Sequence, residues 1–166
     1  EGNVKHNILP IKGRFDFVIR HKESSELFLI ELKTIGSRSG QMKVPEEEHQ
    51  SQWCFYADMK NIRHGFVIYE NREDLEPIYF PIELSEKDLV LYNPKGHVEE
   101  TKKDFLVDLY GHVEFALWCS QNNLFPAEKC GSCAKWGCKY PDLCASMPKE
   151  KELVSYQTWK ISKTNK

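Results

Sequence analysis

The sequence predicts an α/β fold. Two observations indicate it: short apolar segments bounded by polar turns alternate with longer segments of helical character, and the apolar content is that of a globular chain. The chain has 166 residues, 40% of them hydrophobic, which is enough for a core of ordinary size. This composition excludes wholesale disorder and collagen-like repeats. No apolar run approaches the length of a membrane span, so we expect no membrane partner.

Residues 14–20 and 26–34 are expected to form an antiparallel hairpin. In the first segment Phe15, Phe17 and Ile19 recur at every second position, which is typical of a strand with one packed face. The second segment is almost continuously apolar, which is typical of a central strand covered on both faces. The polar turn between them is short enough to join neighbouring antiparallel strands.

A surface loop, a helix and two strands are predicted next. Residues 35–44 are rich in Gly and Ser and indicate the loop. Pro45 and the three glutamates after it then begin a helix that extends to about Asn61, because proline fits a first turn and acidic residues complement the helix dipole. The strands are expected at residues 64–70 and 77–84.

Two further helices are predicted in the second half of the chain. The segment from Ser85 to Asp88 resembles a capping box, which favours a short helix that stops at residues 93–96. From about Glu99 to Asn122 apolar residues recur at helical spacing, which predicts an amphipathic packing helix.

The six cysteines fall into two groups. Cys54 and Cys119 each lie in an apolar helical stretch and are expected to be core thiols. The other four lie close together and, without a secretory signal, favour a metal site over disulfides in a reducing compartment, cytoplasmic or nuclear. These four are Cys130, Cys133, Cys138 and Cys144.

Three charged residues interrupt the predicted hairpin. Glu31 and Lys33 share one face of their strand, and the hairpin can bring Asp16 beside that face. A salt bridge from Lys33 to either carboxylate is one interpretation. The other is a metal site, because two carboxylates and the Leu32 carbonyl can hold Mg²⁺ or Mn²⁺ and Lys33 can assist the attacking water.

These residues resemble the signature of the PD-(D/E)XK nuclease superfamily. Gly13-Arg14-Phe15-Asp16 matches the part of that signature that carries the Asp, and Glu31-Leu32-Lys33 matches E-x-K. In the following helix Gln52 and Tyr56 are four residues apart and match the Q-x-x-x-Y element of the RecB-type branch. The resemblance implies that Asp16 and Glu31 bind metal and that Lys33, Gln52 and Tyr56 complete the catalytic set.

The resemblance also implies a fold and a function. The fold would be a restriction-endonuclease-like mixed sheet flanked by helices. The function would be Mg²⁺- or Mn²⁺-dependent hydrolysis of DNA, as an exonuclease in recombination, repair or phage DNA processing. The implied partners are single-stranded DNA or duplex ends and a larger recombination or replication complex. The alternative is a catalytically inactive module that retains the fold and binds nucleic acid or another protein.

Relatives of this kind usually carry one more metal ligand, an acidic residue or His on a helix before the first core strand. Only a dozen residues precede Gly13, and His6 is expected to belong to an edge strand. Either the chain begins downstream of such a helix, at a cut edge, which is the interpretation we favour, or this protein lacks the helix, which would weaken metal binding and activity.

Two metals remain open for the cysteine cluster. RecB-type relatives often end in a cysteine group that binds a 4Fe–4S cluster. The spacing Cys130-x₂-Cys133-x₄-Cys138-x₅-Cys144 is also one residue from that of a zinc knuckle, and four local thiolates suit tetrahedral zinc. Zinc is favoured, in a structural role.

The predicted organisation is thus a nuclease core over residues 1–126, a Cys₄ module over 127–148 and a basic tail over 149–166. The net charge is −2, which by itself is unpromising for DNA binding. The tail and the loop at 35–44 are expected to contact phosphates, and a bound metal would make the site favourable to them.

Overall fold

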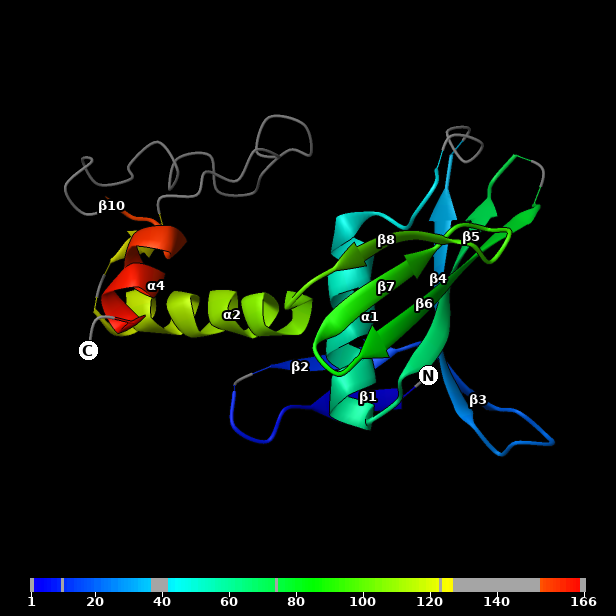
Figure 1. The fold of residues 1–166 in the computed structure, drawn as a ribbon, viewed down its shortest axis with the longest axis horizontal. Helices are drawn as coiled ribbons and strands as arrows, with labels where there is room; N and C mark the ends of the chain where they lie inside the picture. Colours follow the sequence, from blue (N-terminus) through cyan, green and yellow to red (C-terminus); the bar gives the residue numbers. More distant parts are fainter. Residues whose placement is uncertain are drawn as a thin grey trace. The chain divides into compact units, whose positions relative to one another are not determined.

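The computed structural model describes residues 2–9, 11–36, 42–73, 75–122, 124–126 and 153–164 (Figure 1). The chain divides into two compact units, Glu1–Leu109 and Tyr110–Lys166. The strands of the first unit are β1 (Gly2–Lys5), β2 (Lys12–Phe15), β3 (Phe17–Arg20), β4 (Leu27–Ile35), β5 (His64–Asn71), β6 (Pro77–Ser85), β7 (Asp88–Tyr92) and β8 (Val98–Lys102). The helices are α1 (Glu47–Lys60), α2 (Phe105–Gln121) and α4 (Tyr156–Thr164), and the short strands β9 (Phe125–Pro126) and β10 (Leu153–Val154) lie in the second unit.

A six-stranded sheet forms the centre of the first unit, in the order β3-β4-β5-β6-β7-β8. β4 and β5 run parallel, and the other neighbouring strands of this sheet are antiparallel. The sheet is therefore mixed and is flanked by helices, so the predicted α/β class is confirmed. Helix α1 and the strands β5 and β6 lie where the sequence predicts them, and β3 pairs with β4 in an antiparallel hairpin as predicted.

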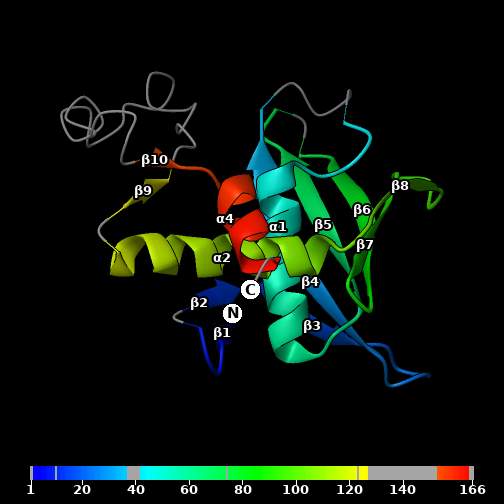
Figure 2. The ribbon, with the colours of Figure 1, turned by 60° about the vertical axis from the view of Figure 1, so that its left-hand side comes forward.

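Helix α1 packs on one face of the sheet, as both ribbon views show (Figure 1 and Figure 2). Its residues Trp53, Cys54 and Ala57 are fully buried in a cluster with residues of the strands β4 to β7. The helix ends at Asn61, whose positive φ of 52° places the C-cap in the left-handed region. This packing holds one side of α1 firmly against β4 and β5, where the charged residues of the predicted site lie.

Gly65 allows β4 and β5 to approach each other and α1. It is paired with Leu29, whose carbonyl oxygen accepts a hydrogen bond from Trp53 Nε1 at 3.1 Å. A Cβ atom on Gly65 would collide with that carbonyl oxygen and with the Trp53 indole nitrogen. The absence of a side chain at this position is therefore a requirement of the packing.

The predicted single strand over residues 14–20 is wrong. It is broken at Asp16, where β2 ends and β3 begins. β2 pairs with β1 in a separate two-stranded ribbon, and β3 pairs with β4 at the edge of the main sheet. Phe17 and Ile19 are 51% and 50% exposed, because alternation in a sequence does not reveal whether another layer covers the apolar face.

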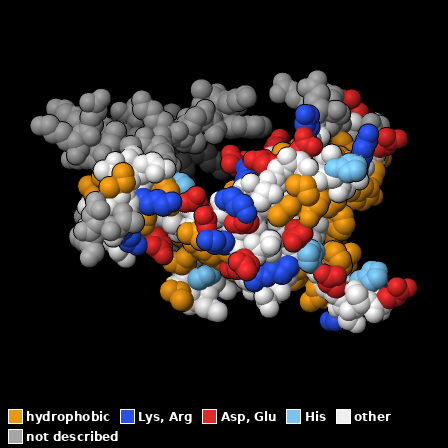
Figure 3. All heavy atoms as spheres, viewed as in Figure 1, with side chains coloured by type: hydrophobic (Ala, Val, Ile, Leu, Met, Phe, Trp, Pro, Cys, Tyr) orange, Lys and Arg blue, Asp and Glu red, His pale blue; other side chains and the backbone are white. Residues whose placement is uncertain are grey.

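Apolar side chains also lie on the surface of the sheet. Figure 3 shows hydrophobic side chains gathered over the strands on the face in view. The large hydrophobic side chains of the sheet that are exposed include Phe17, Ile19 and Tyr79. The prediction that the strand at 26–34 is covered along its whole length therefore holds only in part. Leu29, Ile30 and Glu31 of β4 are buried, whereas Leu32 is 40% exposed.

The short helix predicted after Ser85 is also wrong. A turn at Glu86, whose φ is 54°, joins β6 to β7. Leu89 and Leu91 are both fully buried, at the two-residue spacing of a strand. Asp88 accepts a hydrogen bond from the backbone N–H of Asp104 at 2.9 Å, so its carboxylate binds the residue before α2 and does not cap a helix beginning at Ser85.

The long helix predicted from about Glu99 begins later. Residues 98–102 form the edge strand β8, and α2 begins at Phe105. This segment, which includes Val98, Glu100 and Lys102, is a strand because it pairs antiparallel with β7 at the edge of the sheet. Pairing with a neighbouring strand decided the conformation here, and this pairing cannot be seen in the local pattern.

The second unit has an aromatic core of its own. Phe115 and Cys119 of α2 are buried with Tyr156 and Trp159 of α4. Lys163 of α4 is ion-paired with Glu114 at 2.8 Å. Residues 156–164 of the predicted basic tail thus form a helix with a buried face. None of the helices in the described part of the chain is long and apolar enough to cross a membrane.

Candidate functional site

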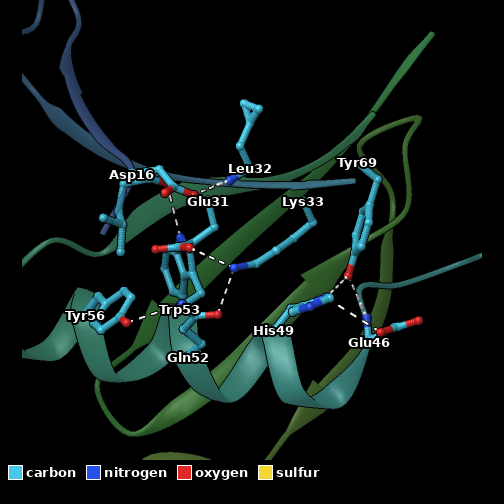
Figure 4. A network of polar contacts seen from close by, with 11 residues as sticks. Asp16, Glu31, Leu32, Lys33, Glu46, His49, Gln52, Trp53, Tyr56 and Tyr69 are labelled. Atoms are coloured by element: carbon cyan, nitrogen blue, oxygen red, sulfur yellow. Dashed lines mark hydrogen bonds and ion pairs between the residues drawn. The ribbon is translucent and has the colours of Figure 1, made fainter. Parts of the chain in front are cut away.

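Strand β4 carries the central residues of the candidate site. The side chains of Glu31 and Lys33 point from β4 toward α1, and the side chain of Leu32 points the other way (Figure 4). This arrangement follows from the alternation of side chains along a strand. It places a carboxylate and an ammonium group in the layer between the sheet and the helix.

Asp16 reaches the same place through the bend between β2 and β3. Its Oδ2 atom accepts a hydrogen bond from the backbone N–H of Leu32 at 2.8 Å. The N–H and C=O groups of a strand residue point to the same side of the strand, so the Leu32 carbonyl is also directed to the Asp16 side of β4. The break in the predicted strand is thus what positions the Asp16 carboxylate.

Glu31 is the most deeply buried charged residue of this site, with 1% of it exposed. Its Oε2 atom accepts a hydrogen bond from Lys33 Nζ at 3.2 Å. Its Oε1 atom is buried and has no hydrogen-bond partner among the described residues. Burial raises the pKa of Glu31 to about 7, although the positive charge of Lys33 opposes this rise.

Lys33 is held between the sheet and the helix by Gln52. Lys33 Nζ donates to Gln52 Oε1 at 2.8 Å, and Gln52 Nε2 donates to the Tyr56 hydroxyl at 3.2 Å. The Tyr56 ring in turn packs against Gly13 of β2, where a Cβ atom would overlap it. The chain of contacts thus extends from β4 through α1 to the ribbon β1–β2.

His49 and Tyr69 lie beside this chain of contacts and were not singled out from the sequence. The Tyr69 hydroxyl lies 2.7 Å from His49 Nδ1 and accepts a hydrogen bond from the backbone N–H of Glu46 at 3.0 Å. Burial, and next the positive charge of Lys33, lower the pKa of His49. The signal that could have found His49 is its position three and seven residues before Gln52 and Tyr56, which puts it on the same helix face.

The structure therefore brings together the side chains predicted from the hairpin and from α1. The salt bridge between Lys33 and Glu31 is present at 3.2 Å. The Asp16 carboxylate is hydrogen-bonded to the backbone N–H of Leu32 rather than to Lys33. Leu32 contributes only main-chain atoms to the site. The four clustered cysteines and residues 37–41 of the predicted loop lie outside the described residues.

His6 is not part of this group. It follows the end of β1, and its Nδ1 atom accepts hydrogen bonds from the backbone N–H groups of Ile8 at 3.1 Å and Leu9 at 2.9 Å. Its ring thus shapes the turn between β1 and β2. Cys54 and Cys119 are buried, free thiols, as predicted, and burial raises the pKa of both.

The donors present are of a kind that suits Mg²⁺ or Mn²⁺. The carboxylates of Asp16 and Glu31 and the carbonyl of Leu32 are hard oxygen ligands. The unpartnered Oε1 atom of Glu31 fits such a ligand, because a buried carboxylate oxygen without a donor is costly. Within the described residues, no group of three or more His, Cys, Asp or Glu side chains has a metal-binding arrangement.

Comparisons with known proteins show similarity to solved structures alone. No family model and no curated protein matches the sequence. Among solved structures, the chain is similar to the crystal structure of SSO0001, with 19% sequence identity and a TM-score of 0.43. The similarity covers 86% of this chain and 52% of that chain, so the present chain spans about half its length. The candidate site therefore rests on its own geometry.

Proposed function

We propose that this chain is a metal-dependent nuclease that hydrolyses DNA phosphodiester bonds, of the RecB-type branch of the PD-(D/E)XK superfamily. The observation that carries the proposal is the buried Glu31 carboxylate, with one oxygen on Lys33 and the other without a partner among the described residues. The ion pair with Lys33 accounts for one of the two oxygens, and the neighbouring Asp16 carboxylate adds to the rise in the pKa of Glu31. The Asp16 carboxylate, which accepts a hydrogen bond from the backbone N–H of Leu32, supplies a second ligand.

In this proposal, Asp16, Glu31 and the Leu32 carbonyl hold Mg²⁺ or Mn²⁺. Bound there, the ion supplies Lewis-acid stabilisation of the scissile phosphate and lowers the pKa of a bound water. The two carboxylates have different tasks in preparing the site. Asp16 is oriented by a backbone N–H, whereas Glu31 has a raised pKa and must lose its proton before it can bind a cation.

Lys33 would act on the phosphate or on the attacking water. Its side chain is 19% exposed, and its ammonium group donates to Glu31 and to Gln52, so two of its three protons have fixed acceptors. The third remains for a phosphate oxygen or a water molecule, where a fixed positive charge stabilises the charge that develops in the transition state.

Gln52 and Tyr56 are positioning residues in this proposal. The Gln52 amide can direct its oxygen to Lys33 only while its NH₂ group faces Tyr56, and the hydroxyl of Tyr56 accepts from that group. Tyr56 is itself fixed by its contact with Gly13. The Q-x-x-x-Y spacing thus serves to aim the ammonium group of Lys33.

The test is a cleavage assay on linear, circular and single-stranded DNA with Mg²⁺, with Mn²⁺ and with EDTA. We expect cleavage that needs the metal and that is lost in Asp16→Asn and Lys33→Met. The matched controls are Glu100→Gln and Lys95→Met, which change exposed residues and should cleave like the wild type. Cleavage that persists in both site variants would refute the mechanism. A folded wild-type chain that binds DNA without cleaving it would support the inactive-module alternative.

We propose, as a separate matter, that Cys130, Cys133, Cys138 and Cys144 hold a structural metal, zinc in preference to a 4Fe–4S cluster. The support is the spacing of four thiols within a short segment. Metal analysis and an absorption spectrum of the purified protein distinguish the outcomes. Stoichiometric zinc without visible absorption supports zinc, iron with a brown colour supports the cluster, and neither metal contradicts both.

A further inference from the structure

The ribbon of β1 and β2 carries a row of positive charge. In its antiparallel register Lys5 is paired with Lys12, and Asn3 is paired with Arg14. Paired residues of a ribbon point to the same face, so the two lysines and Arg14 share one face. All three are exposed, whereas Val4 on the other face is buried.

This arrangement is unfavourable for the ribbon by itself. Like charges directly opposite each other on paired strands destabilise the pairing. Lys5 and Lys12 have no carboxylate within ion-pair distance among the residues that the structure describes. Lys60 of α1 adds a further positive charge at the border of the ribbon, with its Nζ atom 5.1 Å from the centre of the Phe15 ring.

The ribbon that carries this row of charge is joined directly to the candidate site in the chain. β2 is followed by Asp16, and Gly13 between Lys12 and Arg14 contacts the Tyr56 ring. An open depression of about 650 Å³ runs along the ribbon. It is lined by Asn3, Val4, Lys5, Lys12, Gly13 and Arg14. The depression lies along β2, the strand that ends directly before Asp16.

We propose that the ribbon β1–β2 binds the phosphate backbone of the DNA strand that enters the site, mainly through Lys5 and Lys12. The inference rests on the proposed function for the identity of the ligand. A polyanion with regularly spaced charges removes the repulsion between the two lysines, which a neutral or cationic ligand cannot do. The two lysines present ammonium groups, which bind phosphates as point charges, so their contact is independent of the DNA sequence.

The test compares Lys5→Gln/Lys12→Gln with the control Lys22→Gln/Lys95→Gln. The control removes the same charge from two other exposed positions. Binding of a fluorescent single-stranded oligonucleotide is measured in EDTA over a range of salt concentrations. Loss of two phosphate contacts should make the slope of log K against log salt shallower by about 1.4, since each contact on a single strand contributes about 0.7. The control should keep the wild-type slope.

The outcomes separate this inference from the proposed function. An equal slope in the ribbon variant and the wild type, or no binding by the wild type, would overturn the role of the ribbon. Asp16→Asn should keep the wild-type slope while it loses cleavage. If the wild type binds through the ribbon but never cleaves with Mg²⁺ or Mn²⁺, the proposed catalysis fails and the binding surface stands. Thermal unfolding of both double variants checks that they are folded.

Discussion

Glu31 shows how a single residue can be placed against the preference of its surroundings. It is buried in the layer between β4 and α1, where a carboxylate loses its hydration and recovers only part of that free energy from Lys33. Burial accordingly raises its pKa to about 7. The Glu31 carboxyl group is therefore readily protonated near neutral pH. The neighbouring Asp16 carboxylate is oriented by its hydrogen bond from the backbone N–H of Leu32.

The raised pKa of Glu31 makes stability depend on pH. The carboxyl is protonated in the folded state up to about pH 7 but only up to about 4.5 when unfolded. Its contribution to stability is therefore complete below about pH 4.5 and is lost as the pH rises through about 7. The difference between the pKa values of the unfolded and folded states corresponds to about 3 kcal/mol in the free energy of unfolding. We expect Glu31→Gln, in EDTA, to raise the free energy of unfolding by up to that amount at pH 8.

Urea unfolding at pH 5 and pH 8 measures this effect. At pH 5 the folded wild type is already protonated at Glu31, so the variant should differ little from it. Glu100→Gln, on the exposed strand β8, serves as the control and should behave like the wild type at both values. An equal effect of Glu31→Gln at both pH values would show that the pKa is not raised.

Gln52 is expected to act on the rate rather than on DNA binding. Gln52→Leu removes the acceptor that holds Lys33 Nζ at 2.8 Å. A hydrogen bond to a charged group contributes about 1.5–3 kcal/mol, so kcat should fall by roughly 10- to 100-fold while KM for DNA changes little. Tyr56→Phe removes only the contact at 3.2 Å to the Gln52 amide and should have a smaller effect.

Steady-state kinetics on one DNA substrate distinguish this role from a structural one. The pH profile of kcat is the second readout, because a displaced Lys33 no longer opposes the raised pKa of Glu31. A Gln52→Leu variant with normal kcat and a raised KM would contradict the positioning role and indicate a direct DNA contact.

At the scale of the elements, the junction of β4, β5 and α1 decides whether the site can form. Gly65 faces the Leu29 carbonyl, and Trp53 donates to the same oxygen from the helix. Backbone atoms cannot move aside as a flexible side chain can. The parallel pair and the helix must therefore stay at their present separation, which is also the separation that Lys33 and Gln52 bridge.

Gly65→Ala should therefore destabilise the protein strongly. An added Cβ would overlap the Leu29 carbonyl oxygen, so the strands or the helix must shift, and we expect a loss of about 3 kcal/mol. Gly36→Ala is the matched control, because an added Cβ there meets no atom within 4 Å. Urea unfolding of both variants measures the difference. Equal stability of the two would mean that the junction is not tightly packed.

At the scale of the whole molecule, the described residues form two units that each have a core. The core of the first unit lies between the six-stranded sheet and α1, whereas that of the second is built largely from aromatic rings of α2 and α4. Trp159 is 6% exposed, and its ring centre lies 5.5 Å from that of Phe115. The C-terminal segment thus contributes packing as well as positive charge.

Trp159→Ala should loosen the second unit. Truncation of a buried tryptophan costs about 3–5 kcal/mol, so the amide protons of α4 should exchange much faster with solvent. Ile161→Ala, at a position 60% exposed on the same helix, is the control and should leave exchange nearly unchanged. Hydrogen exchange followed by mass spectrometry measures both. Unchanged protection of α4 in the tryptophan variant would contradict the packing.

The sequence by itself determined the elements whose signals are local. The helix from Glu47, the strand β4 and the shared face of Glu31 and Lys33 follow from proline and acidic residues at a helix start and from the two-residue period of a strand. The four-residue spacing of Gln52 and Tyr56 likewise puts them on one helix face, because residues four apart are neighbours on a helix surface.

Only the tertiary structure decided which strands pair and which side chains meet. The bend at Asp16, the strand β7 after Ser85 and the strand β8 in place of a helix start all depend on a neighbouring strand. The contacts of Asp16 with Leu32 and of Lys33 with Gln52 join residues far apart in the chain. Such contacts depend on burial and register in the whole fold, because local periodicity specifies a face but not the surface it will meet.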